Sequence, residues 1–219
     1  MKYGLALHTT TPELGLAINQ LTEATENFVI LRSQVWHLQR EVSNLLHQYL
    51  LDFLPPQTWQ DLGLIAVAAG PGGFTGTRIG VVAARTFAQQ LGIPVFTIST
   101  LAAYAWHISQ KSLQTLPNQQ NILNIAVQMP AQRGQLFAAI YQINVQQSQM
   151  TPILSDSVFS PSAWQEYLDH YHDNYQLVIA TSGLAATVTS ILQLATWEYQ
   201  QGKRPHWSQA KPFYGQNPV

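Results

Sequence analysis

The chain has 219 residues, with 10 Lys and Arg against 11 Asp and Glu, so its formal net charge is −1 and only 10% of its residues are charged. A hydrophobic content of 46% is too high for an intrinsically disordered chain, and the balance of charge lacks the basic excess of a typical nucleic-acid-binding domain. The absence of Cys excludes disulfides, thiolate nucleophiles and thiolate metal sites.

Hydrophobic periodicity and turn residues divide the first half of the chain into alternating elements. We expect strands at 3–9, 15–20, 27–33, 62–69 and 95–98, and helices at 36–53, 77–91 and 100–109. Pro55 and Pro56 end the first helix. The strand 62–69 is continuously apolar, which indicates a strand covered on both faces.

The second half repeats this order of elements. We expect strands at 122–128, 136–143, 153–159 and 177–181, and helices at 161–171 and 184–200. The polar segment 111–121, which contains Pro117, is the best candidate for a linker, so we predict an N-terminal lobe of residues 1–110 and a C-terminal lobe of residues 111–219 with an irregular tail. Two α/β halves that each open with three strands are typical of the two-lobed actin-like ATPase (ASKHA) fold, in which each lobe is a mixed sheet flanked by helices.

Charge is unevenly distributed along the chain. Residues 62–155 contain four basic side chains and no Asp or Glu. This stretch therefore supplies no carboxylate for general acid–base catalysis or for binding a hard metal ion.

A glycine-rich turn follows the strand 62–69 and is the obvious candidate for phosphate binding. The known phosphate fingerprints fail here, because no Lys follows Gly76 and Thr75 stands where a third glycine is required. We favour a tight turn whose glycines allow positive φ. The residues of this signature loop are Gly70, Gly72, Gly73, Phe74 and Thr75.

The helix 77–91 and the helix 36–53 are the candidate partner-binding surface. Small residues recur every four positions along the former, at Gly76, Gly80, Ala84 and Ala88, and would allow another helix to approach closely. The alternative is that this smooth side packs on the protein's own sheet. The helix 36–53 is apolar over too wide an arc for a surface element. The predicted contact residues are Val35, Leu38, Val42, Leu45, Leu46, Tyr49, Gly76, Arg78, Gly80, Val81, Ala84 and Ala88.

Searches for catalytic and metal-binding motifs are negative. The sequence has no G-x-S-x-G elbow, and none of its seven His lies four residues from another. We therefore predict no catalytic residue, no metal and no cofactor.

Residues 70–80, Gly-Pro-Gly-Gly-Phe-Thr-Gly-Thr-Arg-Ile-Gly, resemble the signature G-P-G-S-F-T-G-x-R-I-G of the TsaB (YeaZ) family. These are accessory subunits in the bacterial synthesis of threonylcarbamoyladenosine in tRNA. The similarity extends through Ile93-Pro94 and 99–101, and includes 131–141 and 211–214.

The resemblance implies an actin-like protein that has lost catalysis and holds a larger catalytic paralogue, TsaD, through a bundle of helices from the N-terminal lobes. It also implies a TsaE-type ATPase as a further partner, a homodimer when the partner is missing, and contact with tRNA only through the complex. We expect a cytoplasmic protein without a membrane anchor, because no stretch reaches the ~18 apolar residues of a membrane span.

Three departures from the family pattern remove charge or polarity. His8 stands where the first strand usually ends in Asp, Gly73 replaces the serine of the signature, and the family's D-A-R-x-G-E begins here at Pro130 and ends at Gln135. Three other functions remain open: an ATP-dependent kinase or carbamoyl transferase, a glycoprotease-like metallopeptidase, and a direct tRNA binder.

Overall fold

The computed structural model describes residues 1–22, 28–115, 122–144 and 147–216. The chain forms two compact units. The first consists of Met1–Thr100 and Gly183–Phe213, and the second of Leu101–Ser182 with the chain end from Tyr214.

The first unit is built on a five-stranded mixed sheet of order β3-β2-β1-β4-β5. Its strands are β1 (Lys2–His8), β2 (Glu13–Leu21), β3 (Ile30–His37), β4 (Leu62–Ala68) and β5 (Val95–Ile98). β1 pairs with β2 antiparallel and with β4 parallel, and every residue of β4 is buried. The prediction of a central strand covered on both faces is therefore confirmed.

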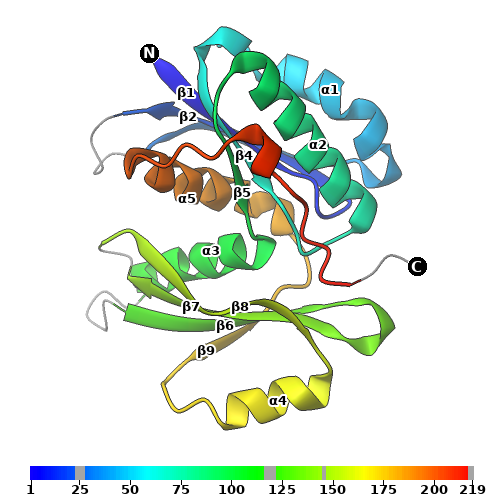
Figure 1. Ribbon diagram of the computed structural model, residues 1–219, viewed down its shortest axis with the longest axis vertical. Helices are drawn as coiled ribbons and strands as arrows, with labels where there is room; N and C mark the ends of the chain where they lie inside the picture. Colours follow the sequence, from blue (N-terminus) through cyan, green and yellow to red (C-terminus); the bar gives the residue numbers. More distant parts are fainter. Residues whose placement is uncertain (23–27, 116–121, 145–146, 217–219) are drawn as a thin grey trace. The chain divides into compact units, whose positions relative to one another are not determined.

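Helices cover both faces of this sheet, with α1 and α2 side by side on one face and α5 on the other (Figure 1). Their bounds are α1 (Val42–Phe53), α2 (Phe74–Leu91) and α5 (Val188–Gln200), with short 3-10 turns η1 (Gln39–Glu41), η2 (Trp59–Asp61), η4 (Leu184–Thr187) and η5 (Trp207–Gln209). α1 buries Val42, Leu46, Leu50 and Phe53, the spacing of one helix face.

The second unit has a four-stranded mixed sheet of order β8-β7-β6-β9. It comprises α3 (Thr100–Thr115), β6 (Ile122–Pro130), η3 (Gln132–Gly134), β7 (Leu136–Asn144), β8 (Gln149–Phe159), α4 (Pro161–Asp169) and β9 (Gln176–Ile179). α4 packs Trp164 and Leu168 on Ala126, Ala138 and Ile140 of the sheet. The order of elements in both units confirms the predicted actin-like fold class.

The division into units differs from the predicted boundary at residues 110 and 111. α5 belongs to the first unit, because Leu192 and Val188 pack against Gly4 and Gly15 of the first sheet. Half of the predicted linker, up to Thr115, continues α3, while Pro117 lies outside the described residues.

Two predicted helices begin elsewhere. Val35 and Trp36 belong to strand β3, where they pair with Gly15 and Leu14 of β2, so the prediction of a helix over 36–53 is wrong for its first six residues. Gln39 has a φ of 55°, and α1 begins only at Val42. α2 begins at Phe74, three residues before the predicted start.

None of the helices in the described parts of the chain combines the length and apolar character that crossing a bilayer requires.

Candidate functional site

The glycine-rich turn between β4 and α2 is held closed by the protein's own backbone. The N–H of Gly73 donates to the carbonyl of Thr10 (2.8 Å), and the carbonyl of Gly70 accepts from the N–H of Thr100 (2.8 Å). Gly70 has a φ of +102°, and a Cβ there would lie 2.2 Å from the carbonyl oxygen of Phe213. The turn therefore needs a glycine at this position for backbone conformation and for close packing.

The first turn of α2 presents the rest of the signature. Gly73 is the N-cap residue, and Thr77 donates its hydroxyl to the Gly73 carbonyl (2.8 Å). Gly73, Phe74 and Thr75 are exposed, whereas Gly72 is half-buried beside Thr10. A helix N-terminus favours an anion through its free N–H groups, but the first turn of α2 contains no charged side chain.

The inner face of α2 lies directly on the segment that follows β1. A Cβ at Gly76 would come within 2.0 Å of the Thr9 carbonyl oxygen, and one at Gly80 within 2.1 Å of the Thr9 hydroxyl. The Thr9 hydroxyl donates to the Gly76 carbonyl (2.8 Å). Ala84 and Ala88, farther along the same face, are completely buried.

His8 ends β1 and is completely buried. Burial disfavours the imidazolium and lowers the pKa of His8 to about 3. Its Nε2 lies 3.4 Å from the Thr10 hydroxyl, which is also 3.3 Å from the Thr100 hydroxyl. A neutral imidazole beside a hydroxyl does not supply the anionic oxygen that Mg²⁺ prefers.

Within the described residues, no three His, Asp or Glu side chains come close enough together to hold a metal ion.

A groove of about 380 Å³ opens on the outer face of α1 and α2. Its lining residues are Ser43, His47, Arg78, Ile79, Val82, Ala83, Thr86 and Phe87. Val82 is 54% exposed although it is apolar. Phe87 lines the groove, with its ring 6.0 Å from that of His47 and stacked on Trp59 at 4.7 Å. An exposed apolar groove with a single cationic side chain, Arg78, is suited to another protein surface.

The structure divides the predicted contact residues into three groups by their exposure. The prediction that the small-residue stripe of α2 faces outward is wrong, because those residues pack on the protein's own sheet. Completely or almost completely buried are Val42, Leu46, Gly80, Val81, Ala84 and Ala88. Half-buried are Val35, Leu38, Leu45, Tyr49 and Gly76, and only Arg78 is exposed.

Of the residues that line the groove, the predicted contact set contains only Arg78. The helical period itself separates the faces. Buried Thr77, Val81, Ala84 and Ala88 define the inner side, which leaves Arg78, Val82 and Arg85 on the outer side. An exposed Val between two exposed Arg is the signal that identifies a surface of interest.

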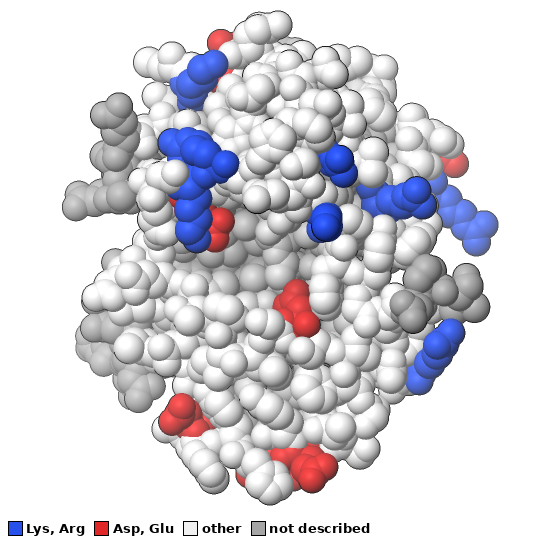
Figure 2. Space-filling model, in the orientation of Figure 1, with Lys and Arg blue, Asp and Glu red and all other residues white. Residues whose placement is uncertain are grey.

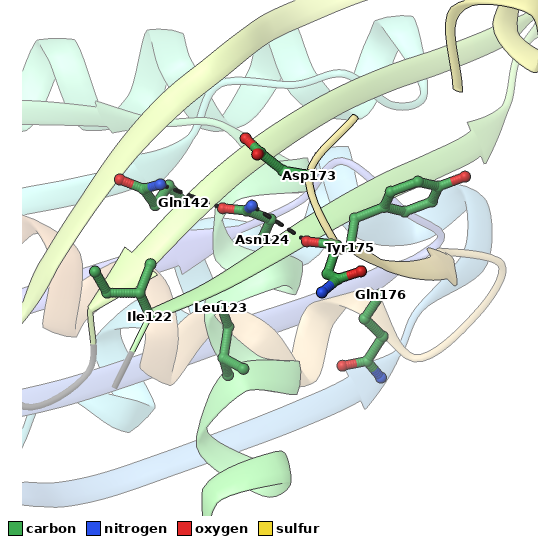
Figure 3. Close-up of a pocket in the computed structure, with 8 residues that line it drawn as sticks. Ile122, Leu123, Asn124, Gln142, Asp173, Tyr175 and Gln176 are labelled. Carbon is green, nitrogen blue, oxygen red and sulfur yellow. Dashed lines mark hydrogen bonds between the residues drawn. The ribbon is translucent and has the colours of Figure 1, made fainter. Parts of the chain in front are cut away.

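The second unit has an open hollow of about 650 Å³ at the start of β6 and β9 (Figure 3). Amide side chains dominate its wall, and they bond to each other and to the backbone. Gln142 donates to the Asn124 side-chain oxygen (3.4 Å), and Asn124 donates to the Asn174 carbonyl (3.2 Å). These bonds fix the side chains of Asn124 and Gln142 in the wall, which also contains Asp173 and Gln176.

Comparisons with known proteins agree with the fold. The family model described as TsaD: tRNA N6-adenosine threonylcarbamoyltransferase matches residues 48–192. The structure of YeaZ from Pseudomonas aeruginosa superposes with a TM-score of 0.71 at 23% identity, covering 98% of this chain and 100% of that one.

Two curated relatives carry the same name, tRNA threonylcarbamoyladenosine biosynthesis protein TsaB. The protein from Bacillus subtilis is 34% identical over 146 residues, which make up 63% of this chain and 54% of the relative. The protein from Buchnera aphidicola is 37% identical over 87 residues, 40% of this chain and 38% of the relative. The matched segment thus spans about half of the length of these relatives or less. On the match to residues 48–192 and on these relatives, the chain belongs to the TsaD family of proteins and, within it, to the TsaB (YeaZ) group.

Proposed function

We propose that this protein takes part in the biosynthesis of threonylcarbamoyladenosine in tRNA as a non-catalytic subunit. In this role it binds and stabilises a TsaD-type catalytic paralogue through the groove on α1 and α2. The observation that carries the proposal is this exposed apolar groove, centred on Val82, in a member of the TsaB group.

The region at the end of β1 supports a non-catalytic role. His8 is neutral near pH 7, and the glycine turn uses backbone groups of Gly70 and Gly73 for bonds within the chain. Residues 62–155 supply no carboxylate. Transfer or hydrolysis of a phosphoryl group with Mg²⁺ relies on acidic ligands for the metal, and these positions do not provide them.

The proposal includes further partners. A TsaE-type ATPase joins the assembly, and tRNA reaches this protein within the complex. The same groove supports a homodimer when the paralogue is missing, because burying its apolar surface against a second copy is more favourable than leaving that surface in water.

Purification of the chain from native extract, with bound proteins identified by mass, tests the assignment. We expect a TsaD-type protein in stoichiometric amount. Calorimetric titration of the isolated chain with Mg-ATP tests the main rival. We expect no turnover, whereas micromolar binding with turnover would identify an ATP-dependent enzyme and overturn the proposal.

A further inference from the structure

Several exposed basic side chains of the first unit come from two distant parts of the sequence, α2 and the segment that follows α5. The segment 203–213, which we call the strap, follows α5 and runs beside α2, which its turn η5 contacts (Figure 1). It carries Lys203, Arg204 and Lys211. All three are exposed, as is Arg85 on the outer side of α2. Blue side chains spread across this face of the first unit in Figure 2.

Contacts tie the strap to α2 and hold its charges in place. Arg85 lies over the ring of Trp207, with its guanidinium carbon 5.3 Å from the ring centroid. The strap backbone is fixed at both ends, because the carbonyl of Pro205 accepts from the N–H of Val95 (3.3 Å) and the N–H of Phe213 donates to the carbonyl of Ala69 (2.6 Å). An anion that binds here meets side chains on an ordered backbone and does not have to order the segment itself.

Only one carboxylate opposes these charges within residues 198–213. Glu198 forms an ion pair with Lys203 at 3.1 Å. Arg204 stacks on Tyr199 at 3.5 Å and donates to the Tyr199 carbonyl, so its charge is held close to the strap. Lys211 and Arg85 have no carboxylate partner among the ion pairs of the described residues.

We propose that Arg85 and the strap residues Lys203, Arg204 and Lys211 form a binding strip for the phosphate backbone of RNA. Arg and Lys on a fixed surface bind phosphodiesters without reading their sequence. The choice of RNA among polyanions rests on the proposed function. None of these four residues lines the groove, although Arg85 lies on the same outer side of α2 as Val82.

The test measures binding of the full-length chain to an unmodified tRNA transcript by fluorescence anisotropy. If the strip neutralises three or four phosphates, the logarithm of affinity falls against the logarithm of salt with a slope of roughly −2 to −3. The triple variant Arg85→Gln, Lys203→Gln, Lys211→Gln should bind at least tenfold more weakly at low salt. Arg204 is kept because its contacts with Tyr199 support the end of α5.

A matched control removes the same charge elsewhere. The variant Lys2→Gln, Arg40→Gln, Lys111→Gln should retain the affinity of the wild type within about twofold, and so should Arg85→Lys, Lys203→Arg, Lys211→Arg. Equal weakening by the strip variant and the matched control would show non-specific attraction and overturn the proposal. Binding to vesicles of anionic phospholipid in preference to tRNA would also overturn it.

Titration of the double variant Lys203→Gln, Lys211→Gln, which leaves Arg85 and the rest of α2 unchanged, with a TsaD-type paralogue separates this inference from the proposed function. Unchanged paralogue binding together with lost RNA binding supports the strip. If the paralogue binds and RNA binding does not depend on the strip, the strip is refuted and the proposed function stands. If RNA binds through the strip and no paralogue binds, the proposed function fails alone.

Discussion

The two sides of α2 contrast in packing and in chemistry. The inner side is made of small residues, and Gly76 and Gly80 lie so close to Thr9 that neither position has room for a Cβ. The outer side carries Arg78 and the exposed Val82 beside an open groove. One side of α2 is thus close-packed in the interior, and the other side borders an exposed groove, which is the partner surface that we propose.

This contrast teaches that small residues at helical spacing indicate close approach but not what approaches. In this protein the approaching element is the segment after β1, which the inner side of α2 needs for its own packing. The partner surface that we propose is therefore the side with larger apolar residues, where Val82 and Phe87 border the groove.

The largest expected effect comes from a charge placed on the inner side of α2, and it tests whether that side belongs to the hydrophobic core. Ala84→Glu places a carboxylate at a completely buried position, and an unpaired buried charge destabilises a fold by several kcal/mol. We expect a large decrease in the free energy of unfolding, measured by chemical denaturation, or no folded protein. Val82→Glu is the matched control on the outer side, and its stability should stay within about 0.5 kcal/mol of the wild type. Equal denaturation midpoints for Ala84→Glu and Val82→Glu would contradict the assignment of the inner side to the core and of the outer side to the surface.

The next prediction compares two glycines of the signature sequence, residues 70–80. Gly76→Ala forces a methyl group toward the Thr9 carbonyl, and overpacking of this kind costs about 1–3 kcal/mol. Gly73→Ala meets its nearest heavy atom at 3.4 Å, so it should change stability far less. Thermal and denaturant unfolding of the pair measures the difference. Indistinguishable stabilities would mean that α2 does not lie on Thr9.

The buried His8 gives the inner region a pH dependence. The folded-state pKa of about 3 is below the ordinary 6.5, so between these values the unfolded chain binds a proton that the folded chain does not. Stability therefore falls as pH decreases, by about 2 kcal/mol between pH 7 and pH 5. Unfolding curves at the two pH values should show this loss, and His8→Gln should remove it. His47→Gln, at an exposed position of the groove, is the control. If the His8→Gln variant loses the same stability between pH 7 and pH 5, the loss comes from other titratable groups.

The smallest expected effect concerns one hydrogen bond. Thr9→Val removes the hydroxyl that donates to the Gly76 carbonyl, and a bond of this kind contributes about 1 kcal/mol. Thr86→Val makes the same substitution on the outer side, where the residue is exposed, and should leave the free energy of unfolding nearly unchanged. Destabilisation by Thr86→Val that equals or exceeds that by Thr9→Val would contradict the predicted order.

The order of elements and the actin-like fold were predictable from the sequence because they follow from local signals. β4 is a continuous apolar run, and helix ends coincide with Gly92 and Pro55 or Pro56 within two residues. These signals depend on few neighbours in the chain, so periodicity and turn residues suffice to locate them.

Features that depend on distant residues were not predictable. Val35 and Trp36 fit a helical pattern, but pairing with β2 holds them in a strand. The packing of α5 on Gly4 and Gly15 places residues 183–213 in the same unit as the first strands. The groove shares this origin, since its two walls come from separate helices, and only their packing leaves Val82 uncovered.

The most direct test of the account is calorimetric titration of a TsaD-type paralogue with the wild-type chain, Val82→Glu and Gln201→Glu. Both substitutions add one negative charge at an exposed position, but only Val82 lines the groove. We predict that Val82→Glu weakens binding about 100-fold or more. This fold-change corresponds to a loss of about 2.8 kcal/mol in binding free energy, which burial of an unpaired charge in the interface would cause. Gln201→Glu should bind like the wild type. Wild-type affinity for Val82→Glu would contradict the claim that this groove is where the protein binds its partner.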